Sequence, residues 1–104
     1  MSEQIVTIFR NRLRPEHREA YSVTSARMTE LAEAMPGFVD AKTFTADDGE
    51  RVTIVTFADL ASERAWRDHP EHRDAQRQGI ADFYAEYSIQ VGTVIYDRAF
   101  RRDT

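Results

Sequence analysis

The chain has 104 residues, of which 31% are charged, and its formal net charge is −4 at pH 7. This length suits a single domain over residues 1–104, and the acidic balance excludes a nucleic-acid surface, which needs clustered Lys and Arg. The absence of cysteine excludes disulfides and thiol chemistry. The sequence has no apolar run long enough for a membrane span and no signal-peptide pattern, so we expect no membrane contact and a cytoplasmic location.

The first part of the chain predicts a strand followed by a helix. Residues 4–14 alternate with the period of a strand. One face of this strand carries Ile5, Thr7, Phe9, Asn11 and Leu13. Pro15 predicts a helix start with Glu16 in the first turn, where a negative charge suits the helix dipole. Apolar residues then recur at three- and four-residue steps as far as Pro36-Gly37, a strong helix stop signal.

Two strands and a second helix are predicted next. Residues 38–45 and 51–57 have the composition of strands and are separated by turn-forming residues at 47–49. Either Asp59 or Ser62 is expected to cap the helix that follows.

The last part of the chain predicts an interrupted helix and a final strand. Pro70 must interrupt the helix, because proline lacks an N–H and disfavours helical geometry at the residue before it. A restarted helical segment is expected to reach Gln78-Gly79. Residues 87–100 then predict a long strand, with Gly92 as a bulge or bend.

This order of elements predicts an α+β, ferredoxin-like fold, in which a four-stranded antiparallel sheet carries both helices on one face. Two helices can cover only one face of the sheet, yet the first and third strands carry apolar residues on both of its faces. The apolar residues of the other face are Val6, Ile8, Val52 and Ile54. Because a soluble monomer rarely exposes an apolar sheet face of this size, we predict a two-fold homodimer through it.

Residues 65–76 contain the only tryptophan and two of the three histidines, within a polar helix. Trp66 has two interpretations, a core residue packed on the sheet or a wall on which a planar ligand stacks. His69 and His72 have a spacing found in metal sites, but no third ligand accompanies them and Pro70 breaks the helix between them, so we expect no metal. His72 is our candidate general base, because imidazole titrates near neutrality.

Further polar side chains are candidates for ligand binding. Asn11 is predicted to point towards the helices, where a buried amide either satisfies a backbone group or binds a ligand oxygen. Gln76 is expected to face the same pocket as Trp66. Tyr84 and Tyr87 either donate hydrogen bonds to the ligand or pack in the core or a dimer contact.

Four motifs along the chain carry a family resemblance. They are Pro36-Gly37-Phe38, Trp66-Arg67-x-His69-x-Glu71-His72, Ala75-Gln76-x-x-Gly79 and Phe83-Tyr84-x-x-Tyr87-x-Ile89-x-Val91. The sequence resembles the antibiotic biosynthesis monooxygenase (ABM) domain family over nearly its whole length. This resemblance implies a dimeric α/β barrel of ferredoxin-like subunits. Some members of the family oxidise phenolic polyketides or anthrones to quinones with molecular oxygen and no metal or flavin, others oxidise quinols, and a sister group degrades haem.

The haem-degrading branch is distinguished by three positions. Its members carry an Asn on the first strand, a Trp on the second helix and a haem-ligating His ten residues after that Trp. Asn11 and Trp66 match the first two positions, but the third is Gln76, which is a poor iron ligand. His69 or His72 would have to substitute from an earlier, proline-interrupted segment, so haem degradation is the least favoured interpretation.

The resemblance implies a cofactor-independent monooxygenase or oxidase that acts on an electron-rich aromatic compound (a phenol, anthrone or quinol), with molecular oxygen as co-substrate. Trp66 would stack on the ring, Asn11 and Gln76 would hold its oxygen with Tyr84 as a further contact, and His72 would accept a proton. The alternative is a non-catalytic dimeric barrel that binds a small hydrophobic ligand, because a binding pocket uses the same residue types.

Overall fold

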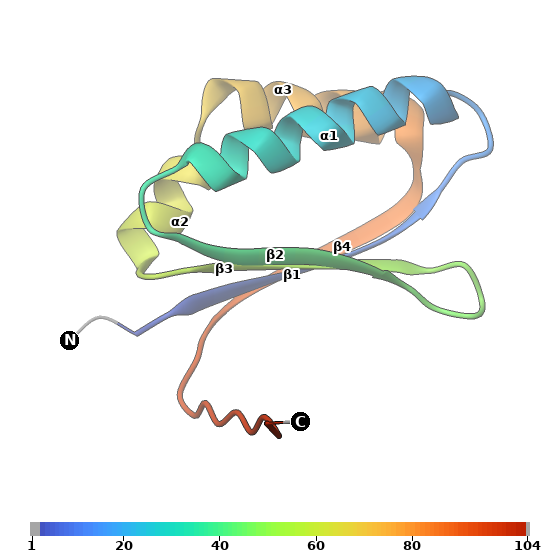
Figure 1. Ribbon diagram of the computed structural model, residues 1–104. Helices are drawn as coiled ribbons and strands as arrows, with labels where there is room; N and C mark the ends of the chain where they lie inside the picture. Colours follow the sequence, from blue (N-terminus) through green and yellow to red (C-terminus); the bar gives the residue numbers. More distant parts are fainter. Residues whose placement is uncertain (1–2, 104) are drawn as a thin grey trace.

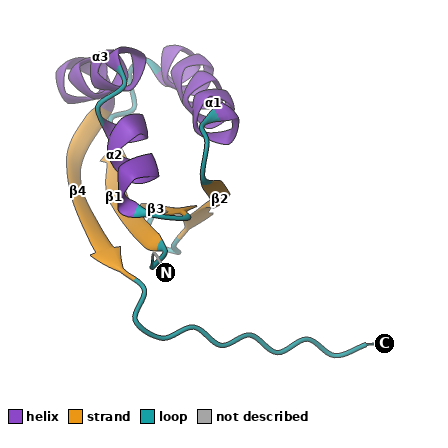
Figure 2. Ribbon diagram, turned by 90° about the vertical axis from the view of Figure 1, so that its left-hand side faces the viewer, coloured by secondary structure: helices purple, strands orange, loops and turns teal. Residues whose placement is uncertain are grey.

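The computed structural model describes residues 3–103 and contains a four-stranded antiparallel sheet in the order β2-β3-β1-β4. In chain order the elements are β1 (Ile5–Leu13), α1 (Arg18–Ala34), β2 (Phe38–Thr45), β3 (Arg51–Phe57), α2 (Leu60–Arg67), α3 (Pro70–Gln78), the π-helix η1 (Gly79–Phe83) and β4 (Tyr84–Thr93). All helices lie on one face of the sheet (Figure 1, Figure 2). This arrangement confirms the α+β, ferredoxin-like prediction, with the second helical unit divided in two.

Local sequence signals set the ends of the helices between β3 and β4. The side chain of Asp59 accepts a hydrogen bond from the backbone N–H of Ser62 at 2.8 Å and so caps α2. Pro70 is the first residue of α3, which confirms that it interrupts the helix. The Nδ1 atom of His69 accepts from the backbone N–H of Glu71 at 3.1 Å and caps α3. His69 is therefore used as a helix cap.

The start of α1 differs from the prediction. The helix begins at Arg18, and His17 precedes it with a φ of 62°, so Glu16 lies outside the first turn. The backbone N–H of Arg14 donates to the carbonyl of Phe83 at 2.7 Å, and the Arg14 guanidinium pairs with Glu16 at 3.4 Å. These contacts hold the segment around Pro15 beside the start of β4. The helix α1 therefore starts only after this segment.

The last strand, β4, covers Tyr84–Thr93 and not the predicted residues 87–100, because its pairing with β1 sets its limits. β4 pairs with β1, and the last backbone hydrogen bond runs from Val94 N to Gln4 O at 2.9 Å. Within the described residues no strand lies beside the chain beyond this point. Residues 95–103 leave the sheet on the side away from the helices (Figure 1).

Two irregularities lie near the start of β4. The pairing register of β1 and β4 shifts between Arg12 and Leu13, whereas Gly92 pairs regularly with Val6. Of the two alternatives predicted at Gly92, a bulge or a bend, the bulge is therefore wrong. Immediately before β4, α3 continues into η1, an element type found frequently at functional sites. A Cβ atom at Gly79 would lie 2.3 Å from the ring of Tyr84, so the close packing of this ring requires a glycine.

The core lies between the helices and the sheet. Its buried apolar residues are Ile5, Leu31, Ala32, Val55, Phe57, Trp66 and Phe83. Thr7 and Asn11 are buried on the same face of β1, which confirms the alternation predicted for this strand. Phe57 is fully buried under Trp66 of α2, with 5.4 Å between the ring centroids.

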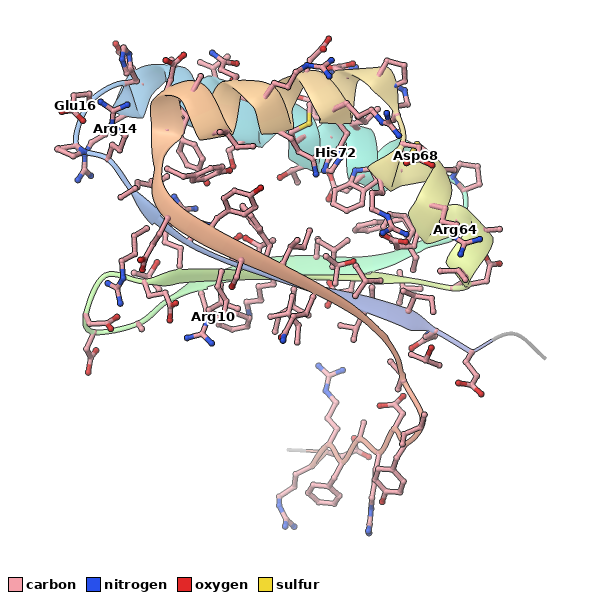
Figure 3. The ribbon with its side chains drawn as sticks, turned by 180° about the vertical axis from the view of Figure 1, so that it is seen from behind. Arg10, Arg14, Glu16, Arg64, Asp68 and His72 are labelled. Carbon is pink, nitrogen blue, oxygen red and sulfur yellow. The ribbon has the colours of Figure 1, made fainter. Side chains whose placement is uncertain are left out.

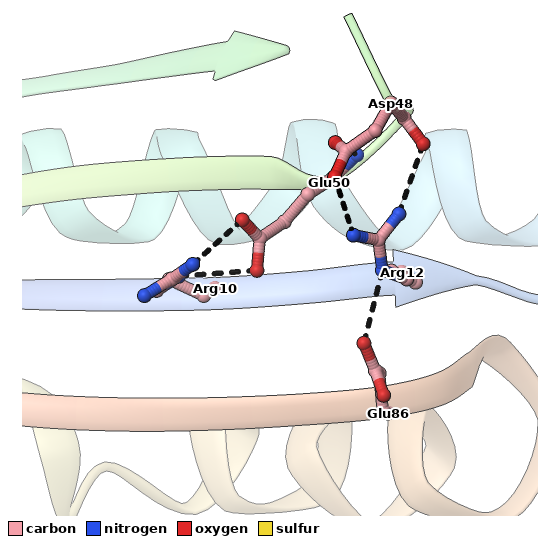
Figure 4. Close-up of polar contacts among 5 residues, drawn as sticks. All are labelled: Arg10, Arg12, Asp48, Glu50 and Glu86. Carbon is pink, nitrogen blue, oxygen red and sulfur yellow. Dashed lines mark hydrogen bonds and ion pairs between the residues drawn. The ribbon is translucent and has the colours of Figure 1, made fainter. Parts of the chain in front are cut away.

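The other face of the sheet, called the outer face below, has an apolar centre and a charged end. Its apolar residues are Val6, Ile8, Phe44, Val52 and Ile54, as the strand registers place them. At the charged end, Arg10 pairs with Glu50 at 2.8 Å, and Arg12 pairs with Asp48 at 2.8 Å and Glu86 at 3.0 Å (Figure 4). No helix within residues 3–103 is long and apolar enough to cross a membrane.

Candidate functional site

A cavity of about 250 Å³ lies between the helices and the inner face of the sheet. All four strands, α1, the end of α2, α3 and η1 contribute to its walls. His72 points from α3 into the space between the helices and the sheet (Figure 3). A cavity therefore lies in the region where the ligand pocket was predicted.

The cavity walls combine aromatic rings with uncharged polar groups. Within the described part of the chain, no Asp, Glu, Lys or Arg lines the cavity. The aromatic residues of the walls are Phe9, Tyr21, Trp66, His72, Phe83, Tyr84 and Tyr87. A charged ligand would find no opposite charge in these walls, and burying an unpaired charge is costly. The walls therefore suit an uncharged planar ligand.

Trp66 is part of the core and also lines the cavity. Its side chain is only 8% exposed and packs on Phe57, as a core residue does. It also lines the cavity, where its ring lies 4.2 Å from that of His72 between centroids, at an interplanar angle of 43°. The indole Nε1 atom is buried and has no hydrogen-bond partner within the described residues. Trp66 therefore forms a rigid wall with an unused donor.

His72 is buried beside a backbone carbonyl group. Its side chain is 9% exposed, and its Nδ1 atom lies 3.3 Å from the backbone carbonyl of Arg67. A carbonyl only accepts hydrogen bonds, so the neutral ring carries its proton on Nδ1 and a lone pair on Nε2. Burial lowers the pKa of His72, the Arg67 contact opposes this, and the charge of His69 adds to the lowering. The imidazole is therefore neutral near pH 7.

A cluster of tyrosines forms the end of the cavity near η1. Tyr84 packs edge-on against Phe9, with ring centroids 5.4 Å apart, and contacts Tyr21 and Tyr87 at 6.2 and 5.9 Å. Burial raises the pKa of Tyr84 well above its ordinary value, and the neighbouring Tyr21 raises it further. The Tyr84 hydroxyl therefore stays protonated and is available as a hydrogen-bond donor.

Four of the five residues predicted for the site line this cavity: Trp66, His72, Gln76 and Tyr84. Gln76 does so from an exposed position on α3. Asn11 is different, because it is buried on the inner face but is not part of the cavity wall. It pairs with Tyr87 and Arg51 on the adjacent strands, and its Oδ1 atom has no partner within residues 3–103.

Sequence reasoning missed several polar residues of the cavity wall: Thr7, Tyr21, Thr24, Ser25, Thr29, Thr43 and Thr53. Thr7 was placed on the correct strand face but not in the site, and Tyr21 was used only for helix periodicity. The signal for Thr7 was a hydroxyl residue between Ile5 and Phe9 on an otherwise apolar face. No comparable signal marks Tyr21, because an aromatic residue on the inner stripe of a helix is usually core.

The sequence and the fold were compared with known proteins. The model of the family described as antibiotic biosynthesis monooxygenase matches residues 4–78. No curated protein matched the sequence. Among solved structures, Rv0793 from Mycobacterium tuberculosis is similar with a TM-score of 0.79 at 18% identity, covering 92% of this chain and 99% of that one.

Two further structures have the same fold. A point mutant of SnoaB, a cofactor-independent oxygenase from Streptomyces nogalater, has a TM-score of 0.77 at 15% identity and covers 92% of this chain and 97% of its own. Protein SO0527 from Shewanella oneidensis has a TM-score of 0.77 at 12% identity, with coverages of 90% and 93%. The family match spans most of the sequence and the structures share its fold, so the chain belongs to the antibiotic biosynthesis monooxygenase family.

Proposed function

We propose that this protein is a cofactor-independent monooxygenase or oxidase that oxidises an electron-rich aromatic compound, a phenol, anthrone or quinol, with molecular oxygen. The observation that carries the proposal is an aromatic cavity, free of charged side chains within residues 3–103, in which a neutral histidine packs against the only tryptophan. Membership of the family and similarity in fold to a cofactor-independent oxygenase support it.

In the proposed reaction His72 is the general base. Its Nε2 atom takes the acidic proton of the substrate, and the resulting substrate anion gives one electron to oxygen. The substrate radical and superoxide then combine into a peroxide. With an anthrone, loss of water from the peroxide leaves the quinone, so one oxygen atom enters the product and the other leaves as water. The cavity positions the ring for this sequence and excludes bulk water.

The remaining site residues are assigned binding roles in this proposal. Trp66 stacks on the aromatic ring of the substrate, and Gln76 and Tyr84 donate hydrogen bonds to its oxygens. Asn11 acts through its neighbour on β4, Tyr87, which lines the cavity. Asn11 is thus assigned the role of a positioning residue.

Replacement of His72 by glutamine is expected to lower kcat about 100-fold, because the general base is lost while a polar side chain of similar size remains. The measurement is oxygen uptake in metal-free buffer with a panel of anthrones and hydroquinones, corrected for a blank without enzyme. Val23→Ala, at a 70% exposed position on α1, is the control and should match the wild type.

The pH dependence of the same assay tests the protonation state of His72. Because burial lowers its pKa below the ordinary 6.5, the base stays neutral and the wild-type rate should hold from pH 8 to below pH 6.5 before it falls. In His72→Gln this fall in rate at low pH should disappear. Equal rates for the variant and the wild type would refute the assignment of His72. Ligand binding without any oxygen uptake would favour the non-catalytic alternative.

We also propose that two copies of the chain pack through the outer face of the sheet. Ile54 is 36% exposed at the centre of this face, beside Ile8 on β1, and Phe44 is 49% exposed. The segment after β4 leaves the sheet on the same side (Figure 1), and it contains three exposed apolar residues: Ile95, Tyr96 and Phe100. Covering these groups with a second copy removes them from water.

Ile54→Glu is expected to convert the dimer to a folded monomer at micromolar concentration, because desolvating a carboxylate among the apolar side chains of the interface costs more than its pairing with a neighbouring lysine returns. In the monomer the new carboxylate lies opposite Lys42 on β2, so the fold should tolerate it. Light scattering after size exclusion measures the mass, and circular dichroism checks the fold. Val23→Glu, on the exposed side of α1, should remain dimeric. A wild-type monomer would refute the proposed interface.

A further inference from the structure

One rim of the cavity lies between α3 and the edge strand β4. Three apolar or aromatic residues of the cavity wall are exposed on this side: Ile80 at 60%, Tyr87 at 47% and Ile89 at 42%. Gln76 of α3 lines the cavity and is exposed as well. Figure 3 shows this side of the molecule, with β4 nearest the viewer. A wall residue that water also reaches marks an opening, so the cavity opens between α3, η1 and β4.

A second, polar hollow of about 320 Å³ adjoins this rim and is called the arginine groove below. Its lining residues are Arg67, Asp68, Arg73, Gln76, Arg77 and Ile80. Gln76 and Ile80 belong to the walls of both the groove and the cavity. A ligand that extends past these two side chains would therefore pass from aromatic walls without charge to walls that carry three guanidinium groups and one carboxylate.

Helical periodicity places the groove on the side of α3 that faces away from α1. Four of its residues follow each other at helical spacing through α3 into η1: Arg73, Gln76, Arg77 and Ile80. The other side of α3 is occupied, because Glu71 accepts a hydrogen bond from Arg27 of α1 at 2.9 Å. His72 lies between these two sides and points inward (Figure 3). The helix that carries the proposed base thus also carries the groove.

The arginines of the groove keep donors for a further anion. Each of them pairs with one carboxylate through its Nη2 atom, and the pairs are Arg67–Glu63, Arg73–Asp68 and Arg77–Asp74. Within residues 3–103, the Nε and Nη1 atoms of these arginines make no hydrogen bond. A guanidinium has five N–H donors and binds carboxylate or phosphate with two of them in parallel. The groove therefore has unused donors on its cationic groups.

We propose that the ligand of this protein is amphipathic, with an uncharged aromatic part in the cavity and an anionic group, a carboxylate or phosphate on a short flexible chain, in the arginine groove. The chain passes Gln76 and Ile80, and the anion binds the free donors of Arg73 and Arg77. The anion stays outside the cavity, where its burial would be costly. This inference rests on the proposed function for the aromatic ring in the cavity and specifies the remainder of the ligand.

The test uses three naphthalene probes with side chains of similar length. Two are anionic, 4-(2-naphthyl)butanoate and 3-(2-naphthyl)propyl phosphate, and 4-(2-naphthyl)butanamide is the neutral reference. Binding to the full chain is measured by isothermal titration calorimetry at low salt. The comparison of the two anionic probes decides between a carboxylate and a phosphate.

The variant combines Arg73→Gln with Arg77→Gln. The side chains of Arg73 and Arg77 are 56% and 70% exposed, and their carboxylate partners are exposed too, so the fold should persist. Arg67 is left in place because its partner Glu63 is 1% exposed. The control combines Arg18→Gln with Arg64→Gln, which removes the same charge at two exposed positions outside the groove.

We expect the wild type to bind at least one anionic probe about five- to tenfold more tightly than the amide, the effect of two exposed charge contacts. The groove variant should lose this preference and bind the amide within about twofold of the wild type. The control variant should keep the preference. A wild type without the preference, a groove variant that retains it, an equal loss for anionic and neutral probes, an equal loss in the control, or no binding of any probe would overturn the inference.

The two proposals fail in different ways. If His72→Gln takes up oxygen as fast as the wild type while the groove variant loses its preference for an anionic probe, the groove stands and the catalytic assignment is wrong. If oxygen uptake depends on His72 but the wild type binds the anionic probes no better than the amide, the function stands and the groove is wrong.

Discussion

Replacement of Trp66 by alanine is expected to lower the free energy of unfolding by about 3–5 kcal/mol, the range observed when a large buried aromatic side chain is removed. The ring is 8% exposed and packs against Phe57 and His72, with centroid separations of 5.4 and 4.2 Å. Alanine leaves a void that joins the existing cavity, and both neighbouring rings lose their packing contact with the indole. Urea unfolding followed by circular dichroism measures the change.

Two variants complete this experiment. Trp66→Phe keeps an aromatic ring in the same place and should lose less than half as much stability. Val23→Ala removes an apolar side chain that is 70% exposed and should change stability by no more than about 0.5 kcal/mol. A loss below about 1 kcal/mol in Trp66→Ala would contradict the core role of the ring. The phenylalanine variant is the one to use in oxygen-uptake assays, because its fold is expected to persist.

Replacement of Gly37 by alanine is expected to cost at least about 3 kcal/mol, because it combines backbone strain with a collision. Gly37 has a φ of +83°, and a Cβ atom there would lie 2.1 Å from Oγ and 2.6 Å from Cβ of Ser62. The carbonyl of Gly37 also accepts from the backbone N–H of Ala58 at 2.7 Å, which fixes the turn to the start of α2. The new methyl group therefore forces α2 away from the turn.

Gly49 provides a matched control for this substitution. It has a similar φ of +90°, but a Cβ atom there would meet nothing within 4 Å. Gly49→Ala should therefore show only the backbone cost of about 1–2 kcal/mol, and the difference between the two variants measures the collision. Adding Ser62→Gly to Gly37→Ala should recover most of that difference. Equal losses for the two single variants would contradict the predicted collision.

The sequence alone determined the features that depend on neighbours along the chain. Both middle strands have the predicted limits, residues 38–45 and 51–57, because alternating β-branched and aromatic residues and a turn at 47–49 are local signals. Pro70 ends one helix and starts another for the same reason. The inward face of β1 followed from strand periodicity, and four of the five candidate residues were found in the cavity wall.

Only the tertiary structure decided the features that depend on distant parts of the chain. α1 starts late because Arg14 bonds to Phe83, and β4 ends where β1 ceases to pair with it. Asn11 lies outside the cavity wall, and Thr7, which comes earlier on the same face of β1, lies within it. Periodicity assigns both residues to the inner face but gives no position along it. The packing of α2, α3 and η1 over the sheet sets that position, and with it the choice of residues that meet a ligand.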